Sequence, residues 1–537
     1  MSDYAYFDGE NVSKLQVLLE EVTRAKPGSP KARFVQPDDD TVRVLSSKFH
    51  HVVYGRRGTG KSSLLRHIEG QLRGGDRIVA WVDQENLKAL SYPDVLVAAL
   101  AEIFSQFADQ LAIHYPTPKR PWYKFGRAEA SVEQQLIADL KIATLALNDL
   151  KRMPDSSEVE WTEVTFDEST SQSTRTGDLS VNAKAVSIGG SKGRGQSSKK
   201  SKNLELAQRY TASKSEHLER ALSTYRSLMT RVGDVVGDAY VILDDFYHLE
   251  YAKQPNIAGY FHRAVKDSGV WLKFGSIQLW TRLYAGGLPP IGMQVPHDLK
   301  DRTLDRNLQQ FPGTKRFLEG ILANLGEECG VEMTKLFTEG ALDRLILASG
   351  GVPRDYIGLV ALSISEAKSR GMSTKAGSNR VSAEDVNKAA GRTVDNKLSD
   401  MQEDAGSEWV SLHQLVLKLT AHCRVSKSAC FLIDTSDVDL VNKINRLQNM
   451  RFVHHVASNE SPPQKQTARY NVYVLDVSQL AAQRAWQVDF MGWTKREGRR
   501  ARKLIFREGA EVAPVEGVVV ESAIANDDAA AVVEAVE

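Results

Sequence analysis

A glycine-rich octapeptide at residues 55–62, with the pattern G-x-x-x-x-G-K-S, narrows the choice of folds more than any other part of the sequence. Apolar residues precede it at 51–54, and a helical pattern follows it to about residue 70. Glycines in such a turn let backbone N–H groups point inward at a helix N-terminus, where they cradle phosphate oxygens. A strand, this turn and a helix in direct succession predict a phosphate-binding loop in an α/β fold.

The same loop predicts a nucleotide and Mg²⁺ as cofactors. The Lys61 ammonium group is expected to reach the β- and γ-phosphate oxygens, and the Ser62 hydroxyl is expected to bind Mg²⁺. We therefore expect ATP in this position. The residues expected to contact it are Gly55, Arg56, Arg57, Gly58, Thr59, Gly60, Lys61, Ser62 and Ser63.

Besides the phosphate loop, nucleotide hydrolysis requires an acidic side chain beside the metal, at the end of a neighbouring strand. The apolar run at 240–243 ends in Asp244 and Asp245. We expect Asp244 to hold Mg²⁺, directly or through water, and Asp245 to polarise the attacking water. The alternative is a strand that ends in a solvated acidic turn.

Composition limits the remaining choices. The chain has 537 residues, with 42% apolar and 26% charged, which predicts several packed domains and excludes a mainly disordered protein. A net charge of +1 excludes a uniformly basic nucleic-acid coat. Three scattered cysteines favour a reducing compartment. The N-terminus does not have the pattern of a signal peptide and no apolar run reaches membrane-spanning length, so we expect a cytoplasmic location and no membrane contact.

Four segments together resemble the AAA+ ATPases, particularly the origin-recognition and initiator branch and the neighbouring STAND switch ATPases. They are the phosphate loop at 55–62, the acidic strand at 241–245, a polar-ended strand at 271–278, and Gly-Gly-Val-Pro-Arg-Asp at 350–355. The resemblance covers roughly residues 41–390 and leaves an insertion at about 115–205 unexplained. It implies an α/β P-loop core with a parallel sheet, followed by a helical lid and a winged-helix domain.

The resemblance also implies roles for single residues. Arg354 matches the sensor 2 arginine, which reads the γ-phosphate, so we count it with Lys61 and Asp245 as catalytic. Ser276 or Gln278 matches the sensor 1 position, where the family usually has Asn. The candidates for an arginine finger acting on a neighbouring subunit are Arg282, Arg302 and Arg306.

One departure from the family pattern concerns the rate of hydrolysis. AAA+ enzymes usually have Asp-Glu where this chain has Asp244 and Asp245, and STAND switches frequently have a similar acidic pair. Aspartate is one methylene shorter than glutamate, which places its carboxylate farther from the water. The pattern favours a slow switch over a fast motor.

We expect five regions: an N-terminal segment, a P-loop core with its insertion, a helical lid, a winged-helix-like domain, and a basic and then acidic tail. Their bounds are 1–40, 41–300, 301–396, 397–480 and 481–537, with a polar linker at 393–408. Within the fourth, residues 409–477 have the pattern of two or three helices followed by a β-hairpin.

The sequence is compatible with two classes of partner, duplex DNA and another protein. Duplex DNA is expected to contact 409–477 and the basic run at 495–503 if the initiator reading holds, since Lys and Arg neutralise phosphates. The STAND reading expects a protein partner instead, for example in bacterial defence, and no DNA. Both expect a homo-oligomer in the ATP state. A third reading, a degenerate loop that binds ATP only structurally, disagrees with the intact Lys61, Ser62 and Arg354.

Overall fold

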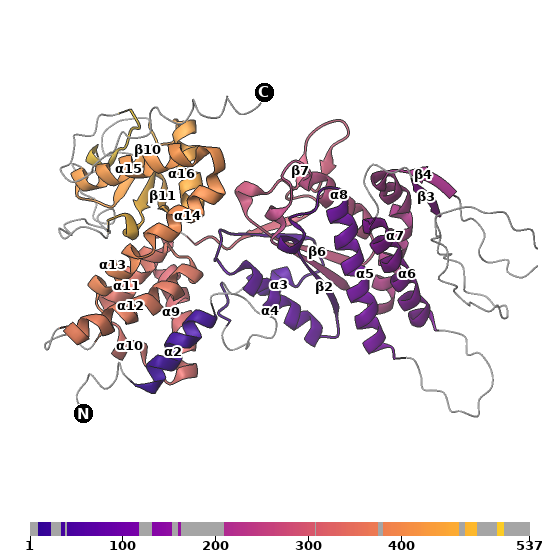
Figure 1. Cartoon of the computed structure of the whole chain (residues 1–537), viewed down its shortest axis with the longest axis horizontal. Coiled ribbons are helices and arrows are strands. Elements are labelled where there is room, and N and C mark those ends of the chain that lie inside the picture. Colours follow the sequence, from indigo (N-terminus) through magenta and orange to yellow (C-terminus); the bar gives the residue numbers. More distant parts are fainter. Residues whose placement is uncertain are drawn as a thin grey trace, which may run out of the picture. The chain divides into compact units, whose positions relative to one another are not determined.

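The chain folds into two compact units in the computed structural model (Figure 1). One, called here the α/β unit, is Ala25–Asp305, and the other, the C-terminal unit, combines Met1–Arg24 with Arg306–Glu537. The structure describes residues 9–22, 34–37, 40–116, 131–152, 159–162, 209–306, 308–373, 380–460, 468–480 and 502–509.

Five strands form the central sheet of the α/β unit, in the order β2-β5-β6-β1-β9. All of their pairings are parallel, which confirms the predicted α/β class. Except for the exposed edge strand β9, they are buried and mainly apolar, typical of strands that helices cover on both faces. Lys273 of β6 is also fully buried. The strands are β1 (His51–Tyr54), β2 (Ile78–Asp83), β5 (Ala239–Asp244), β6 (Val270–Ser276) and β9 (Lys300–Thr303).

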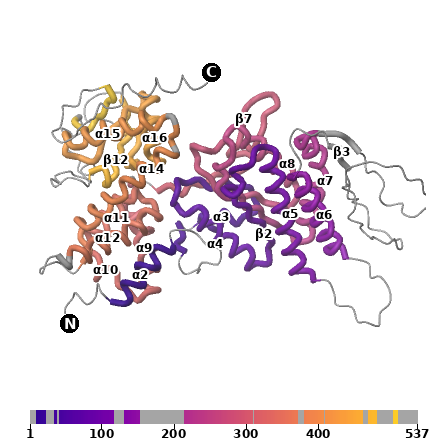
Figure 2. The backbone as a smooth tube through the Cα atoms, in the orientation of Figure 1, coloured from indigo at the N-terminus to yellow at the C-terminus, as the bar shows by residue number. Residues whose placement is uncertain are grey.

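Helices cover both faces of this sheet (Figure 2). The short helix α3 and the helix α4 pack on one face, against side chains such as Val53 and Ile242. The helices α5, α7 and α8 pack on the other face, against side chains such as Val52 and Leu243, and α6 joins the same core. The helices are α3 (Thr41–Leu45), α4 (Lys61–Gly74), α5 (Asp94–His114), α6 (Val132–Arg152), α7 (Lys214–Val236) and α8 (Gln254–Val265).

One helix in the described part of the chain, α5, is long and apolar enough to cross a membrane. Most of its apolar window is buried inside the unit, where Phe104 and Phe107 are fully enclosed. Burial of these side chains in the core accounts for the composition of α5 without a lipid environment.

Two small antiparallel pairs extend the α/β unit. β3 (Val159–Thr162) pairs with β4 (Arg209–Ala212), and β7 (Tyr284–Ala285) pairs with β8 (Ile291–Gly292). Within the predicted insertion, α6 is the helix expected near residues 131–150. Most of the expected hairpin at 158–188 and the basic loop at 189–203 lie outside the described residues.

Helices form most of the C-terminal unit. The N-terminal helix α2 belongs to it, because Gln16 donates to Ser365 Oγ at 3.2 Å and accepts from Lys368 Nζ at 2.8 Å. The helices are α2 (Glu10–Glu21), α9 (Phe311–Cys329), α10 (Met333–Leu336), α11 (Glu339–Ser349), α12 (Pro353–Ser373), α13 (Ala383–Gly391), α14 (Val394–Ala405), α15 (Trp409–Ser426) and α16 (Val438–Asn449).

The linker predicted at 393–408 is wrong, because this segment contains the helix α14. Two of its side chains are buried in the core of the C-terminal unit. Met401 is fully buried, and Lys397 is buried with its ammonium group 2.8 Å from Asp476 Oδ1. The apolar residues Val394, Leu398, Met401 and Ala405 have the spacing of one helical face, so the signal was present in the sequence and was missed among the charged residues.

The last part of the C-terminal unit contains a three-stranded antiparallel sheet in the order β10-β12-β11. β11 (Val453–Glu460) and β12 (Tyr470–Leu475) form the predicted hairpin, whereas β10 (Cys430–Asp434) was not predicted. One helix, α16, separates β10 from β11. A helix-turn-helix needs two consecutive helices, so this arrangement does not confirm a winged helix.

Candidate nucleotide site

The loop at residues 55–60 connects β1 to α4 in a tightly curled conformation. Gly58 and Gly60 have positive φ values of 83° and 94°, which side chains other than glycine adopt only under strain. The Thr59 hydroxyl donates to the Arg56 carbonyl at 2.9 Å. A Cβ atom at Gly55 would lie 2.4 Å from that hydroxyl oxygen, so the curl requires glycine there as well.

Lys61 begins α4, and its side chain is buried against this loop. The ammonium group donates to the carbonyl oxygens of Gly55 and Arg56, at 2.9 and 3.2 Å. It also lies 5.8 Å from the centre of the Tyr247 ring. The charge is thus held over the mouth of the loop, where phosphate oxygens can replace carbonyl oxygens as its acceptors.

Arg56 and Arg57 occupy different environments. Arg56 is buried, and its backbone N–H donates to Asp305 Oδ1 at 2.8 Å. Its guanidinium Nε also reaches this oxygen, at 3.3 Å. The Arg57 guanidinium lies 5.6 Å from the centre of the Trp280 ring. Arg56 therefore anchors the loop to the chain beyond β9, while Arg57 packs on an aromatic side chain.

Asp244 ends β5 with its side chain almost completely buried. It lies beside Gly275 of β6, where a Cβ atom would be 2.3 Å from Asp244 Oδ1, so glycine makes room for the carboxylate. Burial and the neighbouring Asp245 raise the pKa of Asp244 to about 7, although a hydrogen bond from Ser62 and the charge of Lys61 oppose this shift.

These groups fit Mg²⁺. The Ser62 hydroxyl and the Asp244 carboxylate are hydrogen-bonded to each other, and both are oxygen ligands of the kind that Mg²⁺ prefers. The charge of Lys61 acts on this buried carboxylate, but burial and Asp245 outweigh it, so a bound cation would add the charge that stabilises the ionised form. Ser63, the next residue of α4, is exposed.

Asp245 follows in the left-handed backbone conformation, with φ at 53°. Its N–H donates to Asp244 Oδ1 at 3.0 Å. Burial raises the pKa of Asp245, the charge of Lys61 lowers it, and Asp83 and Glu85 add to the increase. The two aspartates thus lie in different surroundings although they are consecutive.

Two residues that were not predicted from the sequence, Glu85 and His248, lie close to Asp245. Glu85 is in the 3₁₀ turn η2 (Gln84–Leu87) after β2, and His248 is in η3 (Phe246–His248) after β5. Burial lowers the pKa of His248. A signal was present, because the strand at 78–82 is followed by Asp-Gln-Glu, and adjacent parallel strands end at the same edge of a sheet.

The candidate sensor 1 residues differ in burial. Ser276 ends β6 next to β1, and its carbonyl accepts the Gly55 N–H at 3.2 Å. Its hydroxyl pairs with Thr281 Oγ1 at 2.5 Å. Gln278 is exposed. Ser276 therefore supports the phosphate loop through its backbone.

The predicted arginines lie in both units. Arg282 and Arg302 are exposed on the α/β unit. Arg306 is in the C-terminal unit, where its guanidinium lies 4.3 Å from the centre of the Phe317 ring. Arg354 is exposed in the first turn of α12, after Gly350 and Gly351, both of positive φ. Since Arg354 and Lys61 belong to different units, the sensor 2 role of Arg354 stays a prediction.

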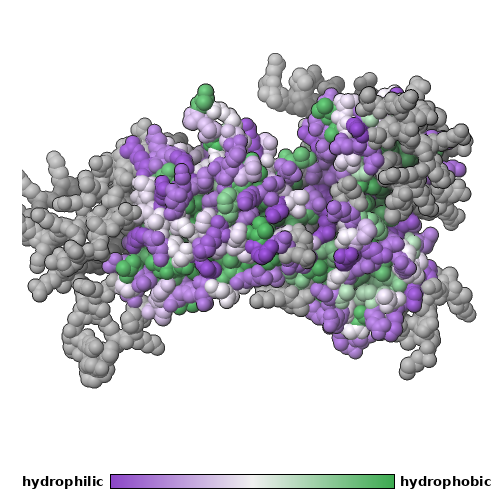
Figure 3. Space-filling model, turned by 180° about the vertical axis from the view of Figure 1, so that it is seen from behind, coloured by the Kyte–Doolittle hydropathy of each residue, from purple (hydrophilic) through white to green (hydrophobic). Residues whose placement is uncertain are grey.

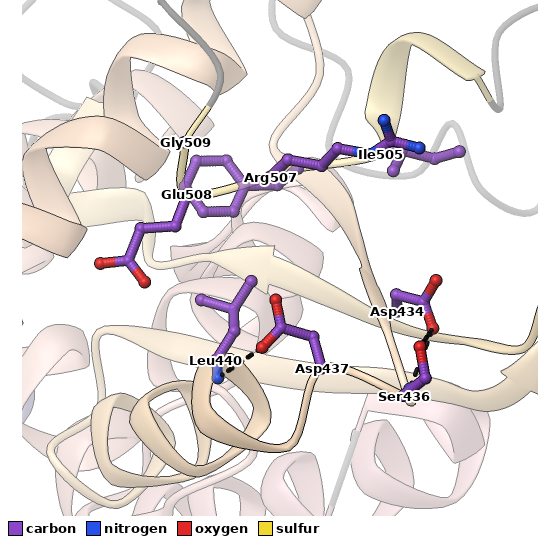
Figure 4. A pocket seen from close by; sticks show the side chains of 9 residues that line it. Asp434, Ser436, Asp437, Leu440, Ile505, Arg507, Glu508 and Gly509 are labelled. Atoms are coloured by element: carbon purple, nitrogen blue, oxygen red, sulfur yellow. Dashed lines mark hydrogen bonds between the residues drawn. The ribbon is translucent and has the colours of Figure 1, made fainter.

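A cavity of about 450 Å³ lies in the C-terminal unit, between the start of α16 and the segment 502–509 (Figure 4). Asp434, Asp437, Arg507 and Glu508 contribute charged groups to its lining. Asp437 accepts the Leu440 N–H at 3.1 Å and caps α16. Three of the four charges are negative, so the cavity does not suit a phosphate group.

The two cations of α16 have acidic partners. Lys443 Nζ lies 3.0 Å from both carboxylate oxygens of Glu508, and Arg446 forms an ion pair with Glu408. The remainder of the basic run, residues 495–501, lies outside the described residues.

Comparisons with known proteins give only weak structural similarity. No protein-family model and no curated protein matches the chain. Among solved structures, a Walker-type ATPase of Pyrococcus abyssi is similar over 86% of this chain and 98% of its own, with 11% identity and a TM-score of 0.41. The Orc1 protein of Aeropyrum pernix, solved in complex with DNA, is similar over 88% of this chain and 90% of its own, with 12% identity and a TM-score of 0.30.

Proposed function

We propose that this chain is an AAA+-like ATPase that binds Mg-ATP, hydrolyses it slowly, and couples the nucleotide state to assembly. The observation that carries the proposal is the meeting of Lys61, Ser62 and Asp244 around one phosphate loop at the carboxyl edge of a parallel sheet.

Each group has a separate task in this proposal. The N–H groups of the loop hold the β-phosphate at the start of α4, and Lys61 neutralises the β- and γ-phosphate oxygens. Ser62 and Asp244 would hold Mg²⁺, which offsets the negative charge that develops on the transferred phosphoryl group. Asp245 orients and polarises the attacking water. Its short side chain and its neighbours Glu85 and His248 support slow hydrolysis.

The proposal is tested with Asp245→Asn. This variant keeps the metal ligand Asp244, so Mg-ATP should bind normally while phosphate release falls by ~10²–10⁴. Asp109→Asn, at an exposed position of α5, is the control and should match the wild type. Measurements of ATP affinity and phosphate release check both points. Undiminished hydrolysis in Asp245→Asn would show that another group polarises the water.

A second candidate is a STAND-like switch that acts on a protein partner without binding DNA. The pairing of Lys443 with Glu508 and of Arg446 with Glu408 favours it, because DNA phosphates would have to compete with these carboxylates for the two cations. The initiator reading instead places DNA on residues 409–477 and 495–503. DNA binding titrated with salt, with and without ATP, separates the two. Affinity that falls steeply with salt supports DNA contact, and no binding supports the switch.

A further inference from the structure

The turns that follow β2 and β5 bring together three side chains that commonly bind metals. Carboxylate oxygens of Glu85 and Asp245 and a ring nitrogen of His248 all lie within 4.8 Å of one another. In the part of the chain that the structure describes, no other group of three His, Cys, Asp or Glu side chains reaches this spacing.

Hydrogen bonds fix the backbone of the two turns that carry these side chains. The Glu85 N–H donates to Asp83 Oδ1 at 3.0 Å, which closes the turn η2. The His248 N–H donates to the Asp245 carbonyl at 3.1 Å, which closes η3. The register of β2 and β5 places Asp83 opposite Asp244, so the two turns begin at the same level of the sheet.

The nearby cations leave room for a metal ion. Lys88 Nζ approaches Glu85 only to 3.9 Å, and both side chains are more than half exposed. Such an ion pair contributes little stability and is easily replaced. The Lys61 ammonium group is already held by two loop carbonyls. The charge of Lys61 acts on Asp245 and that of Arg57 acts on His248, so a metal ion would bind here in competition with these cations.

We propose that Glu85, Asp245 and His248 bind one divalent transition-metal ion, in a site separate from the Mg²⁺ position at Ser62 and Asp244. An imidazole nitrogen suits ions such as Zn²⁺, whereas Mg²⁺ prefers oxygen ligands alone. Three protein ligands with partial solvent exposure leave coordination positions open for water. The two sites therefore differ in metal preference, because one offers a nitrogen ligand and the other offers oxygen ligands alone.

The consequence for hydrolysis rests on the proposed function. An ion bound to Asp245 withdraws this carboxylate from the attacking water. It leaves Lys61, Ser62 and Asp244 available to Mg-ATP. The transition metal would therefore hold the protein in its ATP-bound state, because binding continues while turnover falls.

The test uses Zn²⁺ as the probe, added to the full-length, nucleotide-free protein in an excess of Mg²⁺ and followed by isothermal titration calorimetry. We expect one equivalent to bind. Glu85→Gln and His248→Gln should each weaken binding at least about tenfold, since loss even of outer-shell groups costs ~10–100-fold. His262→Gln is the matched control, since His262 is also half-buried but lies beside His50 at the opposite edge of the sheet.

Two further measurements keep the outcomes separate. Co²⁺ in place of Zn²⁺ should give an absorption spectrum without thiolate charge-transfer bands, which excludes binding by cysteines. Zn²⁺ should lower phosphate release in the wild type and not in His248→Gln. Absence of Zn²⁺ binding, or equal affinity in His248→Gln and the wild type, would overturn the site. If the wild type binds Zn²⁺ as expected but hydrolyses no ATP, the proposed function fails and the metal site stands.

Discussion

At the scale of single residues, Lys61 allows the most direct test of the phosphate loop. Lys61→Ala removes the only charge that contacts two loop carbonyls within the described residues, so no nearby group replaces its contact to the β- and γ-phosphate oxygens. Charge-assisted hydrogen bonds contribute about 1.5–3 kcal/mol each. We expect Mg-ATP affinity to fall at least about tenfold to a hundredfold in calorimetric titrations. Lys88→Ala, on an exposed side chain, is the control, and unchanged affinity in Lys61→Ala would contradict the assignment.

His50 makes the stability of the α/β unit depend on pH. Its Nδ1 accepts the Leu272 N–H at 3.0 Å, and burial lowers the pKa of His50 from 6.5 to about 4. When the pH falls from 6.5 towards 4, the unfolded chain takes up a proton that the folded chain does not, so stability is lost in this window. Between pH 7 and pH 5 the loss from this group is about 2 kcal/mol.

The variant that checks this effect is His50→Asn, whose side-chain oxygen can accept the same N–H but does not titrate. Urea unfolding followed by tryptophan fluorescence should show a smaller loss of stability between pH 7 and pH 5 than in the wild type. His114→Asn, at an exposed position of α5, should behave as the wild type does. The same pH dependence in His50→Asn would assign the acid sensitivity to other groups.

At the scale of helices and strands, the sequence predicted those elements whose apolar residues form a continuous run or a regular spacing. Four strands of the parallel sheet and the helix after the phosphate loop were expected because each is marked by a continuous run or a one-sided pattern. The edge strand β9 was not predicted, since its sequence is polar and exposed. The roles of Lys61 and Asp244 were expected because the G-x-x-x-x-G-K-S pattern and an apolar strand that ends in aspartate are specific signals. Glu85 was missed, since its approach to Asp245 depends on strand order, which the sequence does not state.

The helix α14 and the strand β10 were also not predicted. α14 is anchored by the ion pair of Lys397 with Asp476, and Asp476 also contacts His454 Nε2 at 2.9 Å. Burial by itself raises the pKa of Asp476, but Lys397 and His454 outweigh it and hold the pKa below its ordinary value. β10 pairs with β12 more than thirty-five residues later in the chain. Both elements depend on contacts between distant parts of the sequence.

This buried network predicts a non-additive pair of substitutions. Lys397→Met leaves the Asp476 carboxylate buried without its partner, which typically costs about 3–5 kcal/mol of stability. The double variant Lys397→Met/Asp476→Asn removes both charges and should be more stable than Lys397→Met alone. Thermal unfolding followed by circular dichroism measures both. Equal effects of the single and double variants would show that the charge pairing contributes little.

At the scale of the whole molecule, the helices and the sheet of the C-terminal unit are packed together. The helices α9–α13 and the β10–β12 sheet share a single hydrophobic core. Arg451 forms ion pairs with Asp355 of α12 and Asp400 of α14, each at 2.7 Å. Gly350 lies so close to His454 that an added Cβ atom would be 1.9 Å from its ring nitrogen. The turn that precedes Arg354 is therefore packed directly on the sheet.

The packing of α12 on the β10–β12 sheet suggests how a bound nucleotide could control assembly. The face shown in Figure 3 is mainly hydrophilic, with separate hydrophobic patches between the polar side chains. ATP and ADP differ only in the γ-phosphate, and a ligand shifts an equilibrium only by its differential affinity for the two states. Arg354 is the predicted reader of that difference. Because Asp355 is tied to Arg451, movement of the first turn of α12 would carry the β10–β12 sheet with it.

We therefore expect larger assemblies with ATP than with ADP, and loss of this difference in Arg354→Ala while nucleotide binding is retained. One of Arg282, Arg302 or Arg306 would complete the neighbouring subunit's site in the ATP form. Light scattering on the apo, ADP and ATP forms measures the mass, and Arg316→Ala, at an exposed position of α9 in the same unit, is the control. A mass that is the same in all three forms, with and without DNA, would rule out this coupling, because the γ-phosphate would then have no effect on assembly.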